Sequence, residues 1–273
     1  INTVDIGMLA VPRDKFIFAD DPQTHREYYQ TTPASQLIVA NCEAVHLKEV
    51  MLPDGVLLKE FDPSNGGMFE GAMRQIISKE LISHGINNAN YGIHSSPGRG
   101  ESSPFIAAQL TAHNSCGTYA NGYQVHGMSG GGGIVTLLES IGNEGSHEIG
   151  HNYGLGHFHG GYEGSVHRQF DQNNSAWGWD KDLNRFIPNF SPKVTHIESC
   201  MDGQCQPPFH GRTFGNDGMA GGAPMSTLNR FTLHTPYSAK IMQDFLESKV
   251  VFASDSPTGY RKWNTDTQKM EPY

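Results

Sequence analysis

Three histidines at fixed spacing near the middle of the chain constrain the fold more than any other feature of the sequence. His147 and His151 are four residues apart, so on one helix they lie one turn apart on the same face and can bind one ion. His157 is ten residues beyond His147, which is about 15 Å along a continuous helix. The chain must therefore turn before His157. Gly154 supplies that turn, because glycine enters the left-handed conformation at little cost.

These side chains are the ones that a catalytic zinc site needs. Three histidines on a tetrahedral zinc ion leave a fourth position open for water, whereas structural sites are closed by four protein ligands. Glu148 follows the first histidine, which places its carboxylate beside the ion as a general base for the activated water. Ordinary surface or core histidines are the alternative interpretation. It is the weaker one, because five residues of an eleven-residue frame match.

The composition places this segment in a globular, glycine-rich chain. Of 273 residues 32 are glycine, and aromatic and aliphatic residues are spread throughout. The formal net charge is −9 and there is no basic stripe, which argues against a nucleic-acid binder. Apolar runs such as 134–138 and 250–253 are far shorter than the ~18 residues of a membrane-spanning helix. The chain starts at Ile1 without a leader, so we expect a processed form or an excised domain.

Four cysteines permit three pairings if all are bridged. Cys200 and Cys205 are close enough in sequence to close a small surface loop, which would leave Cys42 and Cys116 as the remaining pair. The even count, low charge and high glycine content favour an exported protein, with four free thiols in a cytosolic protein as the alternative. We reject half of a zinc site at Cys200 and Cys205, because no second pair of ligands is suitably spaced.

Up to residue 130 the pattern of apolar and turn residues predicts a mixed α/β arrangement. We expect helices at about 21–31 and 68–84, the second ending at Gly85, and strands at 36–41 and 45–51. The second helix carries an apolar stripe that we place in the core: Phe69, Met73, Ile76, Ile77 and Leu81. No shift in composition marks a linker, so we expect one domain.

The second part of the chain opens with four glycines at 130–133, followed by the β-prone run 134–138. A phosphate-binding loop is a weak interpretation, because no Lys-Ser or Lys-Thr follows the glycines. We expect instead an edge strand at 134–138 that pairs with an extended peptide substrate. Further along we expect a helix over 140–153, irregular structure over 158–234 with a hairpin near 176–190, and a last helix from Thr235-Pro236 to about 248.

The longer sequence around the histidines resembles the StcE-like secreted bacterial mucinases, also known as ToxR-regulated lipoprotein or TagA-like metalloproteases. The resemblance rests on HEIGHNYGLGH, the preceding glycine run, WGWD and GMAGG, and it extends over the whole chain as the catalytic domain of that family. It implies a zinc endopeptidase, secreted by a Gram-negative bacterium, that cleaves mucin-type O-glycosylated proteins. Carried over by motif, His147, His151 and His157 bind one zinc ion and Glu148 is the catalytic base.

The eleven-residue frame is also the metzincin signature, which implies a metzincin-like α/β (α+β) fold. We expect one catalytic domain over 1–273. Its upper part, 1–157, has a twisted mixed sheet, helices and the active-site helix. Its lower part, 158–273, is irregular, contains a methionine turn and ends in a C-terminal helix, with the zinc ion in the cleft between the two parts.

Met219 is our choice for the methionine turn, because residues 217–222 have the composition of a tight turn. Met201 and Met225 are the alternatives. Some metzincins have a tyrosine ligand two residues after this methionine, where this chain has Gly221, so we expect no such ligand.

Substrate contacts are the part of the site that the sequence predicts least. Trp177, Trp179 and Tyr162 are weak candidates for stacking on sugar rings, and packing of a hairpin by its own aromatic residues is the more frequent role. A protease of unglycosylated polypeptide is the first alternative function. A mucin- or glycan-binding adhesion module on a protease scaffold is the second, and Glu148 argues against it because binding needs no general base. We expect a monomer with no nucleic-acid partner.

Overall fold

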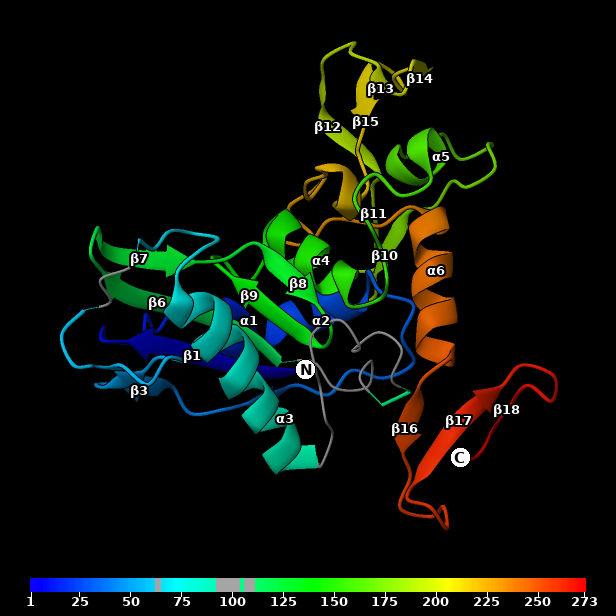
Figure 1. Ribbon diagram of the computed structural model, residues 1–273. Helices are drawn as coiled ribbons and strands as arrows, with labels where there is room; N and C mark the ends of the chain where they lie inside the picture. Colours follow the sequence, from blue (N-terminus) through cyan, green and yellow to red (C-terminus); the bar gives the residue numbers. More distant parts are fainter. Residues whose placement is uncertain (62–64, 92–103, 106–110) are drawn as a thin grey trace. The chain divides into compact units, whose positions relative to one another are not determined.

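The computed structural model describes residues 1–61, 65–91, 104–105 and 111–273, and the chain divides into two compact units (Figure 1). The first unit is formed by residues 1–20, 38–140 and 245–273, and the second by residues 21–37 and 141–244. The three histidines all belong to the second unit. The expectation of one domain over the whole chain, with a boundary at residue 157, stays a prediction. None of the helices in the described ranges is long and apolar enough to cross a membrane.

A mixed sheet of seven strands forms the centre of the first unit. Its strands are β1 (Asn2–Met8), β2 (Ala40–Asn41), β3 (Val45–Leu47), β6 (Thr111–Tyr119), β7 (Gly122–His126), β8 (Ser129–Gly131) and β9 (Ile134–Leu137). The order is β2-β1-β6-β9-β8, with β3 also beside β1 and β7 also beside β6. β1 is parallel to β2, β3 and β6, and β6 to β9, whereas β7 and β8 are antiparallel to their neighbours. The mixed α/β (α+β) class expected from the sequence is confirmed.

The expected edge strand at 134–138 is an interior strand. β9 pairs with β6 on one side and with β8 on the other, and all four of its residues are buried. The glycine run causes this arrangement, because Gly131, Gly132 and Gly133 have positive φ angles and turn the chain back on itself. Since both edges of β9 are occupied, it cannot pair with a peptide substrate, and that expectation was wrong.

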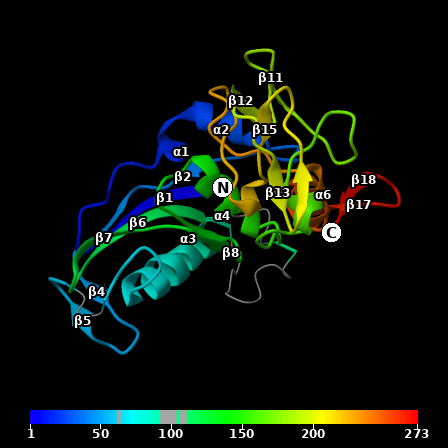
Figure 2. The same cartoon turned by 90° about the horizontal axis from the view of Figure 1, so that it is seen from above.

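One long helix lies against the sheet (Figures 1 and 2). It begins as the π-helical segment η1 (Met73–Ile82) and continues as α3 (Ser83–Tyr91), so it starts later than predicted and does not end at Gly85. The π-helical turn is wider than an α-helical turn. The side chains of this helix that join the core cluster around β1 therefore follow one another at spacings of four and five: Met73, Ile77, Ile82 and Ile86.

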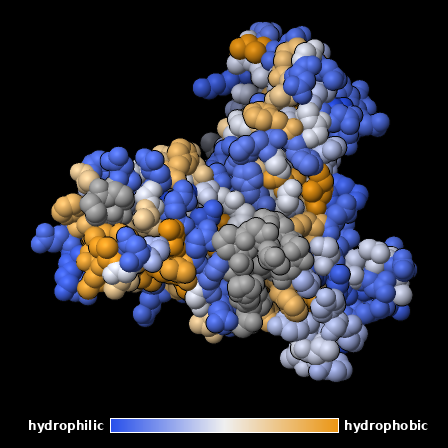
Figure 3. Space-filling model, in the orientation of Figure 1, coloured by the Kyte–Doolittle hydropathy of each residue, from blue (hydrophilic) through white to orange (hydrophobic). Residues whose placement is uncertain are grey.

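The predicted apolar stripe of this helix is only partly in the core. Met73 and Ile77 are buried, but Ile76 and Leu81 face solvent, and so does Phe69 ahead of the helix. A stripe spaced for an α-helix drifts off the buried face when the turn widens, which is why the prediction failed at Ile76 and Leu81. Phe69 is exposed because the helix begins only at Met73. Figure 3 shows apolar residues exposed on the surface of this unit.

The remaining elements of the first unit are short. They are α1 (Ile17–Asp20), the pair β4 (Val50–Met51) and β5 (Leu57–Leu58), and the antiparallel sheet of β16 (Val250–Phe252), β17 (Tyr260–Asn264) and β18 (Lys269–Pro272). The strand expected at 36–41 is reduced to β2, and the one at 45–51 is divided into β3 and β4. The chain also does not end in a helix, because β16–β18 follow the last one. Turns at 254–259 and 265–268 separate their β-prone residues.

The second unit combines helices with small sheets. Its elements are α2 (Pro22–Tyr29), α4 (Gly142–His151), α5 (Gly161–Ser165), β10 (Gly178–Asp180), β11 (Arg185–Ile187), β12 (Phe190–Val194), β13 (Ser199–Met201), β14 (Gln204–Gln206), β15 (Arg212–Phe214), the 3₁₀ turn η3 (Gly218–Ala220) and most of α6 (Pro236–Glu247). The β10–β11 hairpin confirms the one expected near 176–190. Asp21 determines where α2 begins. Its carboxylate accepts the N–H of Gln23, and Pro22 occupies the first position of the helix.

One of the two expected disulfides is present. Cys200 and Cys205 are bonded across the β13–β14 hairpin, where they are directly opposed. Cys42 and Cys116 are free thiols. Cys42 follows β2 and Cys116 lies in β6, on opposite sides of β1, so they are at least two strand spacings, about 9.5 Å, apart. A disulfide requires Cα atoms closer than about 7 Å, so assigning the remaining pair by elimination was wrong.

Candidate metal centre

Helix α4 carries the first two histidines although its own sequence favours a helix weakly. Three of its ten residues are glycines, which are costly in a helix interior, so neighbouring contacts must hold it. Ile149 is buried, and the N–H of Thr232 donates to Ser146 Oγ at 2.9 Å. Gly150 makes room for a neighbour, because a Cβ at this position would lie 2.6 Å from the sulfur of Met219.

The chain turns after α4 as the spacing of the histidines requires. The helix ends at His151, and the N–H of Gly154 donates to the His151 carbonyl at 3.1 Å. Gly154 has a φ of 79°, the left-handed conformation that we expected there. The chain then leaves the helix axis and reaches His157 within three residues.

This turn brings the three imidazole rings together. Their centroids are 4.8 Å apart for His147 and His151, and 4.9 Å for each of these with His157. One nitrogen of each ring lies within 4.8 Å of the other two. His147 and His151 are half-buried, whereas His157 is exposed, so the group is accessible from solvent.

Hydrogen bonds fix which nitrogen of two rings is available. Nδ1 of His147 is 2.8 Å from the Gly218 carbonyl, and Nδ1 of His151 is 2.8 Å from the Leu155 carbonyl. A carbonyl only accepts, so each Nδ1 carries the proton and Nε2 is the unprotonated nitrogen of the neutral ring, the form that can bind a metal. Burial also lowers the pKa of His147, which favours the neutral form that binds a metal. This is the arrangement of metal-binding histidines oriented by a second hydrogen bond.

Glu148 lies next to His147 on the same helix and is only 6% exposed. Asn152 Nδ2 donates to its main-chain carbonyl at 3.2 Å, which supports the end of the helix. The residue is therefore largely shielded from bulk water.

Among the three methionine candidates, Met219 lies at the histidines. It forms part of η3, is 1% exposed and packs against Gly150. The preceding residue, Gly218, accepts the hydrogen bond from His147. Met201 lies in β13, and Met225 packs against Gly215. Met219 is therefore the candidate that packs against the helix of the histidines, and its role as the methionine turn stays a prediction.

Sequence analysis missed the acidic residue that begins this turn. The carboxylate of Asp217 accepts the N–H of Met219 at 2.8 Å and that of Thr235 at 2.6 Å, and His234 Nδ1 lies 3.4 Å away. Burial acts to raise the pKa of Asp217, but the His234 ring and the two N–H groups outweigh it, so this pKa is lowered. An aspartate just before a short turn is a known capping pattern, and this was the available signal.

The aromatic candidates for substrate contacts differ in their surroundings. The ring of Trp177 packs edge-on against Phe186 at 5.7 Å and Phe190 at 5.3 Å. Tyr162 donates to Gln206 Oε1 at 3.1 Å and has a guanidinium over its ring. Trp179 is the most exposed of the three, at 45%. The Trp179 ring also packs edge-on against Phe186, at 5.0 Å, so all three candidates have partners and Trp179 differs only in its larger exposed surface.

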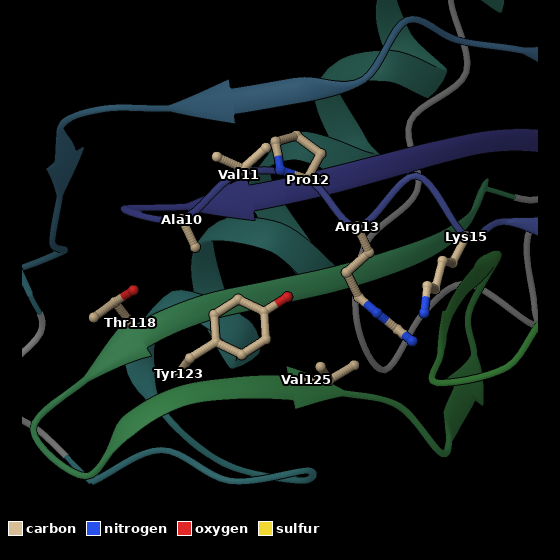
Figure 4. A pocket seen from close by; sticks show the side chains of 8 residues that line it. All are labelled: Ala10, Val11, Pro12, Arg13, Lys15, Thr118, Tyr123 and Val125. Atoms are coloured by element: carbon tan, nitrogen blue, oxygen red, sulfur yellow. The ribbon is translucent and has the colours of Figure 1, made fainter.

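A separate pocket lies in the first unit, and none of the three histidines lines it (Figure 4). Its lining residues are Ala10, Val11, Pro12, Arg13, Lys15, Thr118, Tyr123 and Val125. Arg13 donates a 2.7 Å hydrogen bond to the Leu138 carbonyl, and Figure 4 shows the side chain of Lys15 beside that of Arg13.

The sequence of the chain is similar to those of known metalloproteases. The peptidase M66 family matches residues 1–251. The metalloprotease StcE of Escherichia coli O157:H7 is 62% identical over 274 residues, covering 100% of this chain and 30% of that protein. The ToxR-activated gene A lipoprotein of Vibrio cholerae serotype O1 is 39% identical over 270 residues, covering 97% and 26%. Dictomallein-1 of Dictyostelium discoideum is 28% identical over 186 residues, covering 67% and 31%. The chain thus spans about a third or less of each of these relatives.

Proposed function

The chain belongs to the peptidase M66 family, and we propose that it is a zinc-dependent endopeptidase domain that cleaves mucin-type O-glycosylated proteins. The metalloprotease class follows from the family and from the 62% identity to a metalloprotease. The identity of the ion, its ligands, the catalytic base and the substrate are our proposals.

One zinc ion is proposed, with His147, His151 and His157 as its ligands. The observation that carries this proposal is the convergence of three rings, 4.8–4.9 Å apart, of which two are oriented by a hydrogen bond from Nδ1 to a main-chain carbonyl. Neutral imidazoles suit zinc, and three protein ligands leave one position open. Zinc in such a site supplies Lewis acidity and activates water at neutral pH.

Glu148 is proposed as the general acid and base. It is adjacent to His147 in the sequence, and it is buried, so little bulk water reaches it. Glu148 accepts the proton of the attacking water as the new C–O bond forms at the peptide carbonyl. It then delivers this proton to the amide nitrogen as the C–N bond breaks, which leaves the enzyme unchanged.

The substrate proposal rests on the resemblance to StcE-like mucinases and on one feature of this chain. The exposed ring of Trp179 has an apolar face of the kind that stacks on sugar rings. We also propose that the protein is secreted and acts as a monomer. The Cys200–Cys205 disulfide is typical of exported proteins, although one relative is named a lipoprotein.

Cleavage of one mucin-domain glycoprotein, intact and after enzymatic removal of its O-glycans, tests this function. We expect the wild-type chain to cut only the intact form, a chelator to abolish cutting, and added zinc to restore it. Glu148→Gln, which keeps the size of the side chain, is expected to lose at least about 99% of turnover because general base catalysis contributes 10²–10⁴-fold.

Other outcomes distinguish the two remaining functions. Equal or faster cutting of the stripped form would favour a protease of unglycosylated polypeptide. Binding of the intact glycoprotein without any cutting would favour an adhesion module. Substantial cleavage by Glu148→Gln would remove this residue from its proposed role.

A further inference from the structure

The carboxylate of Asp217 is among the most buried acidic groups that the structure describes, at 1% exposure. Its Oδ1 accepts the N–H of Met219 and its Oδ2 accepts the N–H of Thr235, while His234 lies 3.4 Å away. A buried charge is tolerated only when it is paired and hydrogen-bonded. These partners come from both neighbouring segments, so they hold the side chain in one orientation.

The residue held by Asp217 shares a peptide plane with the partner of His147. The N–H of Met219 and the carbonyl of Gly218 belong to the same peptide unit, which is planar. Asp217 binds the N–H at one end of this plane, and His147 Nδ1 donates to the carbonyl at the other end, at 2.8 Å. The orientation of the carboxylate is therefore transmitted to the imidazole through one rigid unit.

Packing leaves this peptide plane little freedom to tilt. The ring of His234 lies against Gly218, where a Cβ would be 2.9 Å from ring atom Cε1. The sulfur of Met219 fills the space above Gly150 on α4. Asp217 also accepts, through its main-chain carbonyl, the N–H groups of Ala220 and Gly222, which close the turn.

We propose that Asp217 is a positioning residue of the metal centre, which fixes the Gly218–Met219 peptide plane and thereby holds His147 with its Nε2 available for the ion. This inference rests on the proposed function, because it takes His147 as a zinc ligand. It adds a residue 70 positions away from the histidine that it orients. Loss of such supporting partners typically weakens metal binding about 10- to 100-fold.

The test compares two buried aspartates in the full chain. Asp217→Asn keeps the size of the side chain but leaves one of the two N–H groups facing an amide NH₂. Asp180→Asn is the matched control, because Asp180 is fully buried and its Oδ1 accepts the N–H of Leu183 at 2.8 Å in the β10–β11 turn. Zinc affinity is measured by competition with a chelating dye, and the melting temperature of the metal-free protein is measured alongside.

We expect the zinc dissociation constant to rise about 10- to 100-fold in Asp217→Asn and to stay unchanged in Asp180→Asn, whatever each does to the melting temperature. The absorption spectrum of the cobalt-substituted protein, which reports the geometry of the ligands, is expected to change only in Asp217→Asn. Unchanged zinc affinity in a folded Asp217→Asn would give Asp217 a purely structural role and overturn the proposal.

Two further variants keep the test decisive. If Asp217→Asn does not fold, Asp217→Glu takes its place, because it keeps the negative charge and moves the carboxylate away from the Met219 N–H by one methylene group. A zinc affinity equal to wild type in a folded Asp217→Glu would then overturn the proposal, and a weaker one would support it. His147→Ala shows the loss caused by a missing ligand. A wild-type chain that binds no zinc contradicts the proposed function itself, before Asp217 is considered.

Discussion

Two glycines in helix interiors differ in the room that is available for a side chain, and this difference decides how a substitution changes stability. A Cβ at Gly150 in α4 would lie 2.6 Å from the sulfur of Met219, whereas a Cβ at Gly85 in α3 would meet nothing within 4 Å. Alanine is favoured over glycine by about 1 kcal/mol at an ordinary helix position. The same substitution therefore has opposite consequences at the two sites.

We expect Gly150→Ala to lower the free energy of unfolding by about 1–3 kcal/mol, because the methionine must be displaced from its site. Gly85→Ala is expected to raise it by about 0.5–1 kcal/mol. Urea unfolding of both variants measures these changes. Stabilisation by Gly150→Ala would mean that Met219 moves aside without cost, and would contradict the close packing of the methionine turn on α4.

Two strands of the large sheet bury imidazole rings. His113 in β6 is 3.1 Å from Thr136 Oγ1, and His126 in β7 lies between the Gly67 carbonyl and the Tyr119 hydroxyl. Burial lowers the pKa of His113 to about 3 and that of His126 to about 4. Both rings therefore remain neutral in the folded protein at pH values where the unfolded chain binds protons.

This difference predicts how the stability of the first unit depends on pH. A lowered pKa of a base gives stability that is complete above pH 6.5 and is lost as the pH falls towards the folded-state pKa. The free energy of unfolding should thus fall on acidification by up to about 1.4 kcal/mol per pH unit for each histidine. Urea unfolding at pH 7 and pH 5 measures the loss.

His113→Gln is expected to reduce this pH dependence, because it removes one of the two groups. His46→Gln changes an exposed histidine of β3 and serves as the matched control, with the wild-type dependence expected. Equal stability of the wild-type chain at the two pH values would contradict neutral burial of the two rings.

The large sheet and the proposed metal site belong to different units of the chain. The seven-stranded sheet belongs to the first unit, whereas the three histidines, the methionine turn and the disulfide belong to the second. A ligand that binds only the folded state stabilises the unit that holds it. Zinc should therefore act on the unfolding of the second unit.

We expect zinc at one hundred times its dissociation constant to add about 2.7 kcal/mol to the free energy of unfolding of that unit. Calorimetry with zinc and with a chelator shows whether one part of the transition moves, and His151→Ala should abolish the shift. An equal shift in His151→Ala would mean that zinc binds elsewhere.

Features that depend on a few neighbouring residues were predictable from the sequence. The spacing of the histidines required a helix followed by a turn, and Gly154 provides it. Asp21 caps α2, and Cys200 and Cys205 close their own hairpin. Each of these depends on atoms within about ten residues, where helix geometry, capping and turn rules apply directly.

The tertiary structure alone decided the features that join distant segments. Pairing with β8 made β9 an interior strand, and β1 between β2 and β6 kept Cys42 from Cys116. Asp217 reaches His147 only because α4 and the methionine turn meet in the folded second unit. The sequence determined which residues can bind a metal, since ligand type and local spacing are covalent properties. Which residues support them depends on packing between segments far apart in the chain, and no local rule contains that information.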